Sequence, residues 1–246
     1  MMLPKEIFRG YDEHGAIIVR DDGNRRFLSF GETDEQSCVL KASPEVPQYT
    51  FIRAMLYPLM HFTPKRVLTL GLGAGSLTNA LHAQLPELKQ TVVELSPLVV
   101  DVAHRFFYLP RSKRIEIITA DAFEFLQRPV ERRYDMVVSD LYNAEGLNEI
   151  QMESVFIDAC QSRLTQQGWL VLNCWSDHRE AEILDHLKAR FESIYTCTTE
   201  DGNWVLFATN SRQEVSQSQL KSSLKSMSDQ SGFAFNSVAK RVRRLG

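Results

Sequence analysis

Glycines and acidic residues follow several apolar runs of this sequence, in positions where they can bind a nucleoside. The first is the segment Gly71-Leu-Gly73-Ala-Gly75, which directly follows the apolar run Arg66–Leu70. Glycines remove side chains, so the backbone can approach a ligand, and the amides at the start of the next helix face it. The dinucleotide-binding fingerprint needs glycine at the sixth position. This chain has Ser76 there, which argues against a dehydrogenase.

Two acidic positions follow the next two apolar runs. Glu94 ends the run Gln90–Glu94, and a carboxylate there can accept hydrogen bonds from both hydroxyls of a ribose. Asp121 follows Ile115–Thr119 and can accept from the exocyclic amine of adenine, while the small Ala122 leaves room for the ring. Each carboxylate has a simpler alternative role. Glu94 can be a solvated group at a strand end, and Asp121 can cap the helix that begins there.

A fourth strand end carries the residues best suited to catalysis. Asp140 follows the run Tyr134–Ser139, and Tyr142 and Asn143 come directly after it. Ligands of open α/β sheets bind at the carboxyl ends of the strands, so Asp140 is expected beside the reacting atoms. Asp140 can orient an acceptor or take its proton, whereas Asn143 can only orient it through hydrogen bonds. Tyr142 is expected to form a wall of the donor or the acceptor site, and an aromatic ring there suits an acceptor rich in methylene groups.

A fifth strand end adds two candidate pocket residues. Trp175 and Asp177 follow the run Trp169–Cys174, at the same edge of the sheet as Asp140. Both are expected to line an acceptor pocket, although Asp177 can instead cap the next helix. The four cysteines are widely spaced, which predicts reduced core thiols. No cluster has metal-ligand spacing, so no metal site is expected.

The segments between these motifs predict the elements that hold them. Apolar runs alternate with amphipathic segments over residues 48–210, and such repeated βα units indicate a parallel sheet covered on both faces. A helix is expected over Phe51–Phe62, bent or ended near Pro58. Ser193–Thr199 and Trp204–Thr209 flank a turn-rich segment and predict a closing antiparallel hairpin.

Two smaller regions flank this domain. Residues 1–47 read as short strands with polar turns, including a hairpin, and such a small sheet must pack on something larger. Residues 211–246 are predicted to be a polar, basic tail, partly mobile, in which one amphipathic helix can form. Its closing basic run is expected to be solvated, with contact to an acidic partner as the alternative.

Bulk properties describe an ordinary globular protein. The chain has 246 residues, 43% of them hydrophobic, and a formal charge of -3, which gives no reason to expect nucleic acid or membrane binding. The first residues lack the apolar core of a signal peptide, and no window approaches the length of a membrane span. A cytoplasmic protein is expected.

The motifs together resemble the polyamine aminopropyltransferases, that is, spermidine synthase and its relatives. Val93–Pro97 resembles the acidic ribose-binding stretch of that family, and Thr119–Leu126 resembles its adenine-binding segment. Upstream, Gln36-Ser37 resembles the pair that closes the small N-terminal sheet of the family and reaches the nucleoside. Tyr49 leads into a helix as it does there. The resemblance covers roughly residues 15–175.

The resemblance implies an α/β fold of the Rossmann-like class I methyltransferase type. In this fold a seven-stranded, mostly parallel sheet ends in an antiparallel hairpin, and here a small N-terminal β sheet precedes it. The resemblance also implies S-adenosylmethionine or its decarboxylated form as co-substrate, a small-molecule acceptor such as an amine, and a homodimer. It assigns Gln36 to the donor site and Tyr49 to the substrate pocket.

Two departures from the family pattern bear on the chemistry. The glycine loop of the family carries an aspartate that holds the ammonium of the decarboxylated donor, and this chain has Ala74 there. The family has a second aspartate after strand four, and this chain has Asn143 at that position. Losing a charge-assisted contact weakens binding of the decarboxylated donor by roughly one to two decades. Methyl transfer is therefore favoured slightly over aminopropyl transfer in polyamine biosynthesis, and a non-catalytic nucleoside-binding protein is the third alternative.

Overall fold

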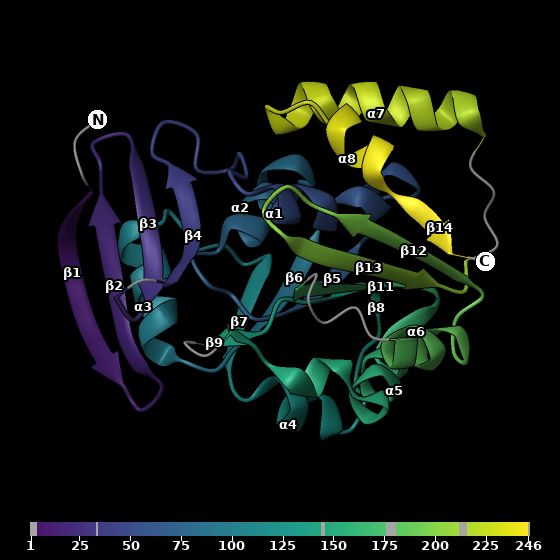
Figure 1. Ribbon diagram of the computed structural model, residues 1–246, viewed down its shortest axis with the longest axis horizontal. Helices are drawn as coiled ribbons and strands as arrows, with labels where there is room; N and C mark the ends of the chain where they lie inside the picture. Colours follow the sequence, from purple (N-terminus) through teal and green to yellow (C-terminus); the bar gives the residue numbers. More distant parts are fainter. Residues whose placement is uncertain (1–3, 33, 144–145, 176–180, 212–215, 246) are drawn as a thin grey trace.

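The computed structural model describes residues 4–32, 34–143, 146–175, 181–211 and 216–245. Figure 1 shows a large twisted sheet with helices on both faces and a smaller sheet beside it. The central sheet has the strand order β14-β12-β13-β11-β8-β5-β6-β7. Its strands are β5 (Arg66–Leu70), β6 (Lys89–Glu94), β7 (Ile115–Thr119), β8 (Tyr134–Ser139), β11 (Leu164–Trp175), β12 (Ser193–Thr198), β13 (Asn203–Thr209) and β14 (Arg243–Leu245).

Five neighbouring strands of this sheet run parallel, in the order β11, β8, β5, β6 and β7. The pairs that β13 forms with β11 and β12, and the pair of β12 with β14, are antiparallel. The predictions of strands at 66–70, 115–119 and 134–139 are confirmed, as is the closing hairpin of β12 and β13. The mostly parallel sheet with an antiparallel end is thus present, and the described residues give it eight strands in place of the predicted seven. The additional strand, β14, pairs with β12 at the edge.

The register of the parallel strands brings their carboxyl ends together. Leu70 of β5 pairs with Val93 of β6 and with Ser139 of β8. Glu94 in turn pairs with Thr119 of β7. The residues that follow these pairs therefore emerge at a single edge of the sheet, where ligands of open α/β sheets bind.

Two layers of helices bury the sheet. The helices are α1 (Thr50–Met55), η1 (Tyr57–Met60), α2 (Ser76–Gln84), α3 (Pro97–Phe106), α4 (Ala122–Gln127), η2 (Glu149–Met152), α5 (Ser154–Ser162), α6 (Ala181–Lys188), α7 (Gln217–Ser231) and α8 (Asn236–Arg241). One layer, formed by α4, α5 and α6, covers one face, and α1, α2, α7 and α8 cover the opposite face (Figure 1).

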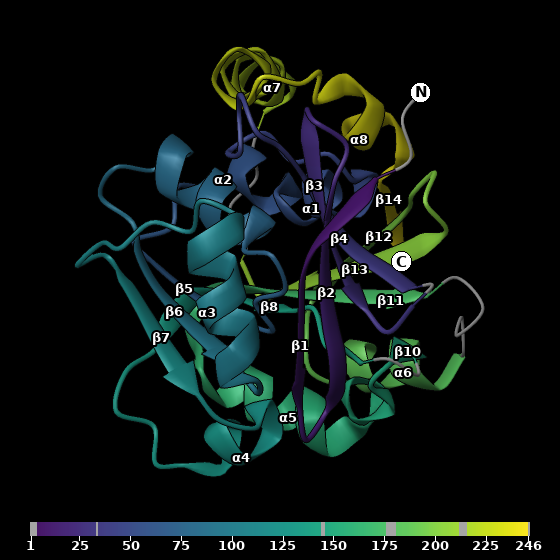
Figure 2. The ribbon, with the colours of Figure 1, turned by 90° about the vertical axis from the view of Figure 1, so that its left-hand side faces the viewer.

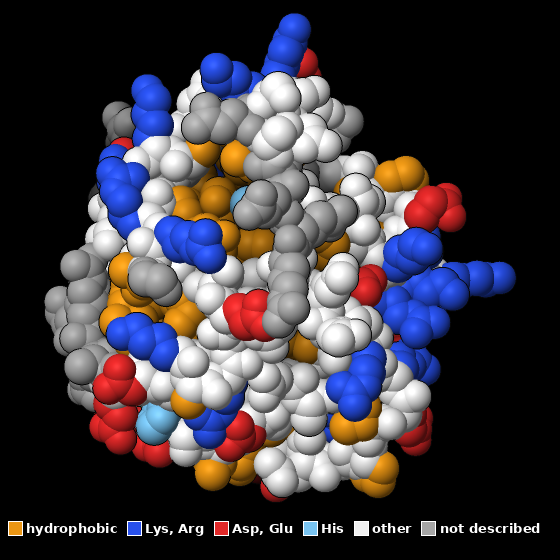
Figure 3. All heavy atoms as spheres, turned by 90° about the vertical axis from the view of Figure 1, so that its right-hand side faces the viewer, with side chains coloured by type: hydrophobic (Ala, Val, Ile, Leu, Met, Phe, Trp, Pro, Cys, Tyr) orange, Lys and Arg blue, Asp and Glu red, His pale blue; other side chains and the backbone are white. Residues whose placement is uncertain are grey.

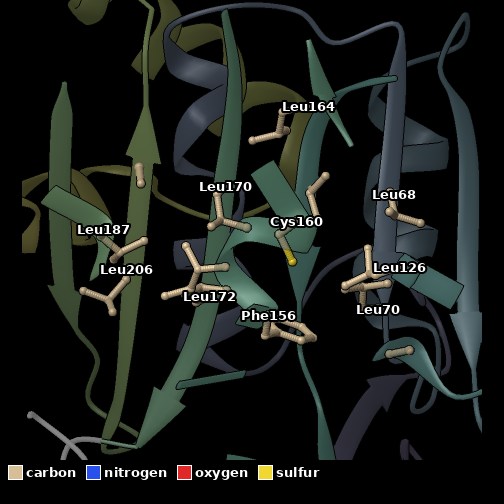
Figure 4. Packing of buried hydrophobic residues seen from close by; sticks show 14 of the residues in the cluster. Leu68, Leu70, Leu126, Phe156, Cys160, Leu164, Leu170, Leu172, Leu187 and Leu206 are labelled. Atoms are coloured by element: carbon tan, nitrogen blue, oxygen red, sulfur yellow. The ribbon is translucent and has the colours of Figure 1, made fainter. Parts of the chain in front are cut away.

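Alternating strand residues face these two layers. Leu68 and Leu70 of β5 and Leu170 and Leu172 of β11 point toward α4, α5 and α6 and pack with Phe156 there (Figure 4). Their immediate neighbours, such as Val67 and Val171, belong to the cluster on the other face. Both faces of these central strands are thus apolar, as expected of a parallel sheet covered on both sides.

The N-terminal sheet is antiparallel, with the order β1-β2-β3-β4. Its strands are β1 (Lys5–Asp12), β2 (Gly15–Asp21), β3 (Arg25–Phe30) and β4 (Asp34–Leu40). Figure 2 shows it standing in front of α3 at one end of the central sheet. Its apolar face packs on α3 through a buried cluster that includes Val19, Leu28 and Val102. The predicted hairpin of β2 and β3 is confirmed, and β1, whose sequence is more polar, extends the sheet to four strands.

The C-terminal segment contains the helix that its sequence allows, and a second helix and a strand follow it. Its described residues form α7, α8 and β14, and α7 begins with a capping box at Ser216. Buried Met227, Phe235 and Val238 attach this segment to the cluster around α1 and α2. These sparse apolar residues lie on one side of the helices, so they suffice to hold a segment whose composition is mostly polar.

The closing basic run binds its own chain. Arg241 forms an ion pair with Glu200, and Arg244 donates a hydrogen bond to the Ser193 hydroxyl at 3.1 Å. On the face shown in Figure 3, basic and acidic side chains are interspersed. Among the described helices, none combines the length and the apolar character that crossing a bilayer requires.

Candidate functional site

A cavity of about 530 Å³ opens at the carboxyl ends of the parallel strands. The central sheet, the N-terminal sheet and the β12–β13 turn all contribute to its walls. Most of the predicted site residues line it. These are Gln36, Tyr49, Gly71, Gly73, Glu94, Asp121, Ala122, Asp140, Tyr142 and Trp175.

Three predicted residues stand apart from this group. Gly75 lies at the N-cap of α2 in a left-handed conformation and does not line the cavity. A Cβ at Gly75 would lie 2.9 Å from a methyl group of Leu109, so this glycine serves the packing of the loop. The backbone of Asn143 belongs to the short strand β9 (Tyr142–Asn143), which pairs with β10 (Gly146–Leu147), and its side chain lies outside the described structure. Asp177 lies outside the described residues.

The glycine loop brings the end of β5 against the end of β8. Gly71 has a φ of 91°, and a Cβ there would overlap the backbone oxygen of Asp140. The Gly71 amide donates to the Val93 carbonyl at 2.8 Å, and the Asp140 amide donates to the Leu70 carbonyl at 2.9 Å. Only glycine adopts this backbone without strain, and only glycine leaves room for the neighbouring strand.

Glu94 organises the loop as well as lining the cavity. Its Oε2 atom accepts from the Leu72 amide at 2.8 Å, and its Oε1 atom accepts from the Ser96 amide at 3.0 Å. Burial raises the pKa of Glu94, and these amide hydrogen bonds oppose the shift. Because each carboxylate oxygen has a second lone pair, the group can hold the loop and still accept from a ribose hydroxyl. Glu94 is therefore not the solvated strand-end group of the simpler interpretation.

Asp121 caps the helix that the sequence predicts after it. Its Oδ1 atom accepts from the Glu124 amide at 2.8 Å at the start of α4. Asp121 and the nearly buried Ala122 also line the cavity. The cap uses Oδ1, so Oδ2 can accept from a ligand, and capping and ligand binding are compatible.

Asp140 lines the cavity directly after the end of β8. Its Oδ1 atom accepts from Asn173 Nδ2 at 2.8 Å. Burial raises the pKa of Asp140 to about 6, and the hydrogen bond from Asn173 opposes this shift. A carboxylate with such a pKa is ionised near neutral pH and is a stronger base than an exposed aspartate, which suits proton acceptance.

A buried polar network extends from Asp140 into the sheet. Asn203 Nδ2 donates to Asn173 Oδ1 at 3.1 Å, and the Tyr142 hydroxyl donates to the Asn173 carbonyl at 3.3 Å. Asn173 and Asn203 are both buried. Burial, and then the charge of Asp140, raises the pKa of the Tyr142 phenol, so Tyr142 remains a neutral donor.

Aromatic groups and another carboxylate complete the acceptor side. Tyr142 and Trp175 meet edge to face with ring centroids 6.2 Å apart, and Tyr49 stacks on Phe51 at 5.6 Å. Asp201, in the β12–β13 turn, accepts from both the amide and the hydroxyl of Thr50 at 2.6 Å. The turn is thereby held against the start of α1.

The N-terminal sheet also reaches the cavity. Asp12 and His14, at the β1–β2 turn, line it, and Asp12 is hydrogen bonded to the hydroxyl of Ser96, the N-cap of α3. Ala74, where the resembled family has aspartate, is fully buried against residues such as Val19 and Val99 and does not line the cavity. The apolar packing of the two sheets thus accommodates an alanine there.

The cavity is strongly acidic. Five carboxylates line it, and none of its described lining residues is lysine or arginine. The carboxylates are Asp12, Glu94, Asp121, Asp140 and Asp201. A cationic ligand is favoured in such a cavity because the field of the site attracts it.

Five further residues that line the cavity were not predicted from the sequence: Asp12, His14, Asn173, Asp201 and Asn203. Asn173 had a usable signal, since it is a polar residue near the end of the apolar run 169–174, at the same edge as Asp140. Asn203 and Asp201 lie in the turn-rich segment between two predicted strands, where polar residues are ordinary. Asp12 and His14 had no local signal, because their place depends on how the two sheets pack.

Comparison with known proteins places these features in context. Residues 54–199 match the spermine/spermidine synthase domain. The polyamine aminopropyltransferase of Neisseria meningitidis serogroup A is 28% identical over 235 residues, which cover 92% of this chain and 88% of that protein. A Drosophila melanogaster homologue of the eEF1A lysine and N-terminal methyltransferase is 25% identical over 190 residues, which cover 73% of this chain but only 28% of that protein.

Solved structures share the fold. A probable spermidine synthase from Corynebacterium glutamicum superposes with a TM-score of 0.75 at 18% identity, over 98% of this chain and 94% of that one. Human methyltransferase-like protein 13, solved in complex with SAH, gives a TM-score of 0.62 at 24% identity, over 74% of this chain and 90% of that one.

Proposed function

Because this chain belongs to the spermine/spermidine synthase family and is a transferase of the S-adenosylmethionine type, we propose that it transfers the methyl group of intact S-adenosylmethionine to an amine nitrogen. The site has the groups that each part of these two substrates requires.

The nucleoside occupies the side of the cavity nearest β6 and β7. Glu94 accepts from the ribose hydroxyls, and Asp121 accepts from the adenine amine beside the small Ala122. The cavity volume of about 530 Å³ is in the range of small-molecule sites and accommodates a nucleoside with its amino-acid tail.

The placement of charge around the glycine loop carries the choice of donor. Residues of β4, β5 and α2 that line the cavity there are neutral: Gln36, Ser37, Thr69, Ser76 and Thr78. No carboxylate of the described lining comes from the loop or from α2. Intact S-adenosylmethionine carries both an ammonium and a carboxylate at this end, and a neutral polar wall tolerates both. The decarboxylated donor carries an ammonium alone, which meets no carboxylate on the loop or on α2 among the described lining residues.

Transfer is a direct displacement at carbon. The acceptor nitrogen donates its lone pair to the methyl carbon as the carbon–sulfur bond breaks, and the bonding electrons remain on sulfur. The proton leaves the nitrogen for Asp140, whose carboxylate is held by Asn173. The acidic cavity retains the positively charged donor and orients the acceptor, so positioning and electrostatics supply most of the rate enhancement.

Aminopropyl transfer is the second candidate, and a specific observation favours it. The aminopropyltransferase relative aligns over 92% of this chain, whereas the methyltransferase relative aligns over 73%. In this alternative the acceptor nitrogen attacks the aminopropyl carbon that is bonded to sulfur in the decarboxylated donor. The carbon–sulfur bond breaks, its electrons remain on sulfur, and methylthioadenosine leaves. Asp140 and Asp201 would then provide the negative charge for the cationic acceptor.

Calorimetry with purified protein separates the candidates. S-adenosylmethionine, its decarboxylated form and methylthioadenosine are titrated separately, and transfer to small primary amines is then followed by mass spectrometry. Tighter binding of intact donor, with a methylated product, is expected. Preference for the decarboxylated donor with an aminopropylated product would establish the second candidate. Binding without turnover would establish a nucleoside-binding protein without catalysis.

A homodimer remains a further proposal. The edge strand β1 carries the exposed side chains Ile7 and Tyr11, which a second copy can cover. Sedimentation equilibrium of the wild-type protein is expected to give twice the chain mass. An Ile7→Lys/Tyr11→Lys variant is expected to shift toward the mass of one chain, and a monomeric wild-type protein would contradict the proposal.

A further inference from the structure

The carboxylate of Asp140 is hydrogen bonded to the first of two buried asparagines, which lie on neighbouring antiparallel strands and are hydrogen bonded to each other. Asn173 of β11 donates to Asp140, and Asn203 of β13 donates to Asn173. Side chains alternate between the faces of a strand, so Asn173 and Asn203 share the face that carries Val171 and Val205. They are diagonal neighbours in this pair of strands, since Asn203 pairs with Trp175.

We propose that Asn173 and Asn203 are positioning residues that hold Asp140 as a hydrogen-bond acceptor with one oxygen directed to the substrate amine. The proposal deepens the proposed function and rests on it, because it assigns how the base of the transfer reaction is oriented. Neither asparagine is assigned to the reaction by the comparisons.

The direction of each amide follows from the chain of donors. Asn203 donates to Asn173 Oδ1 at 3.1 Å, so the Asn173 amide must present Nδ2 to Asp140. If the Asn173 amide were reversed, two NH₂ groups would face each other and an amide oxygen would face a carboxylate. Asn203 thus determines the orientation of Asn173, and Asn173 in turn engages only Oδ1 of Asp140.

The arrangement keeps the carboxylate charged in a buried place. A neutral donor stabilises the ionised form of Asp140, whereas burial stabilises the protonated form. Within the described lining of the cavity, no lysine or arginine supplies a compensating positive charge. Tyr142 stays a neutral phenol, Cys174 of β11 stays a neutral thiol because burial raises its pKa to about 12, and Asp201 is another carboxylate of the same cavity.

Titration of the Asp140 carboxyl tests the proposal without requiring turnover. The full-length protein is labelled with ¹³C at aspartate side chains, and the Asp140 signal is identified by its absence from the Asp140→Asn spectrum. Asn173→Leu is expected to raise the titration midpoint of Asp140 by at least about one pH unit, because a hydrogen bond to the charged form is lost. Asn203→Leu removes the donor to Asn173 and a hydrogen bond of 3.5 Å to the Tyr142 hydroxyl but leaves Asn173 itself in place, so it is expected to raise the midpoint by a smaller amount.

Asn79→Ala is the matched control. Asn79 is also buried and donates its amide to the Phe107 carbonyl, but it does not line the cavity. Its loss is expected to lower stability and leave the Asp140 midpoint unchanged. In active protein, Asn173→Leu is also expected to lower kcat at neutral pH while the Kd of the donor stays within a few-fold.

The outcomes separate the inference from the proposed function. An unchanged Asp140 midpoint in folded Asn173→Leu, or an equal shift in Asn79→Ala, would overturn the role of the asparagines. If Asn173→Leu does not fold, the midpoint in Asn203→Leu decides alone. If the wild-type protein transfers no group, the proposed function fails even when the titration behaves as expected.

Discussion

A Cβ at Gly71 would overlap the backbone carbonyl oxygen of Asp140, although the two residues are far apart in the sequence. Gly71, which follows β5, and Asp140, which follows β8, are thus in contact through their backbones. This contact sets the distance between the donor loop and the proposed base, so the two halves of the site are held as one unit.

Replacing Gly71 with alanine is expected to damage both fold and site. Gly71→Ala combines a left-handed backbone with a collision against a neighbouring strand, and the expected loss of stability exceeds about 2 kcal/mol. Gly23→Ala is the matched control, because Gly23 also has a positive φ but has no atom within 4 Å of the added Cβ. Urea unfolding of both variants measures the difference. Equal losses would show that the collision with Asp140 is relieved at no cost.

Asp140→Asn is expected to lower the transfer rate while leaving donor binding nearly unchanged. Asparagine keeps the shape of the side chain but cannot take the proton, so kcat should fall by about 10² to 10⁴. Asp135→Asn, at the other end of the same strand, is the control. Its carboxylate accepts from the amides of Lys65 and Arg66 and should not affect the rate constant. Steady-state kinetics with saturating donor decides the matter, and a kcat close to that of wild type would exclude Asp140 as the base.

The same substitution is expected to increase stability at neutral pH. The pKa of Asp140 is about 6 in the folded protein, above its usual value of 3.8. The folded protein therefore binds the Asp140 proton more tightly than the unfolded chain does. The stability that this proton contributes is fully present below about pH 4 and is lost as the pH rises through 6. Asparagine is neutral at every pH, so Asp140→Asn avoids the cost of burying a charge. The variant should therefore be more stable than wild type at pH 7 by up to about 3 kcal/mol.

Thermal or urea unfolding at several pH values follows this effect. The advantage of Asp140→Asn should disappear as the pH falls from 7 to 4, where wild-type Asp140 is protonated. A variant that is less stable than wild type at pH 7 would argue that the charged form of Asp140 is stabilised in the fold.

Glu94→Gln is expected to weaken binding of adenosyl ligands. Glutamine has one oxygen, so its NH₂ group must face either the Leu72 amide or the Ser96 amide, and two donors then meet. The Kd of S-adenosylhomocysteine should rise by about 10-fold or more. Glu116→Gln, on the neighbouring strand β7 and largely exposed, serves as the control in calorimetry. An unchanged Kd for Glu94→Gln would remove Glu94 from the ribose site.

The local pattern of the sequence determined most of the central domain. Apolar runs identified β5, β7 and β8 at their observed bounds. For β5 and β8 the reason is that a strand buried on both faces needs a continuous apolar segment. The same pattern located Gly71, Glu94, Asp121 and Asp140 at strand ends. Parallel strands of similar register present their ends at one edge, so these residues meet without any further information from the sequence.

Tertiary structure alone decided the remainder. Asn203 reaches Asn173 because β13 inserts between β11 and β12, and Asp12 reaches the cavity because a separate sheet packs on α3. The polar C-terminal segment is held by a few apolar residues that find a partner only in the folded protein. These contacts join distant segments through strand order and packing, and a polar side chain in a local pattern does not indicate which buried partner will satisfy it.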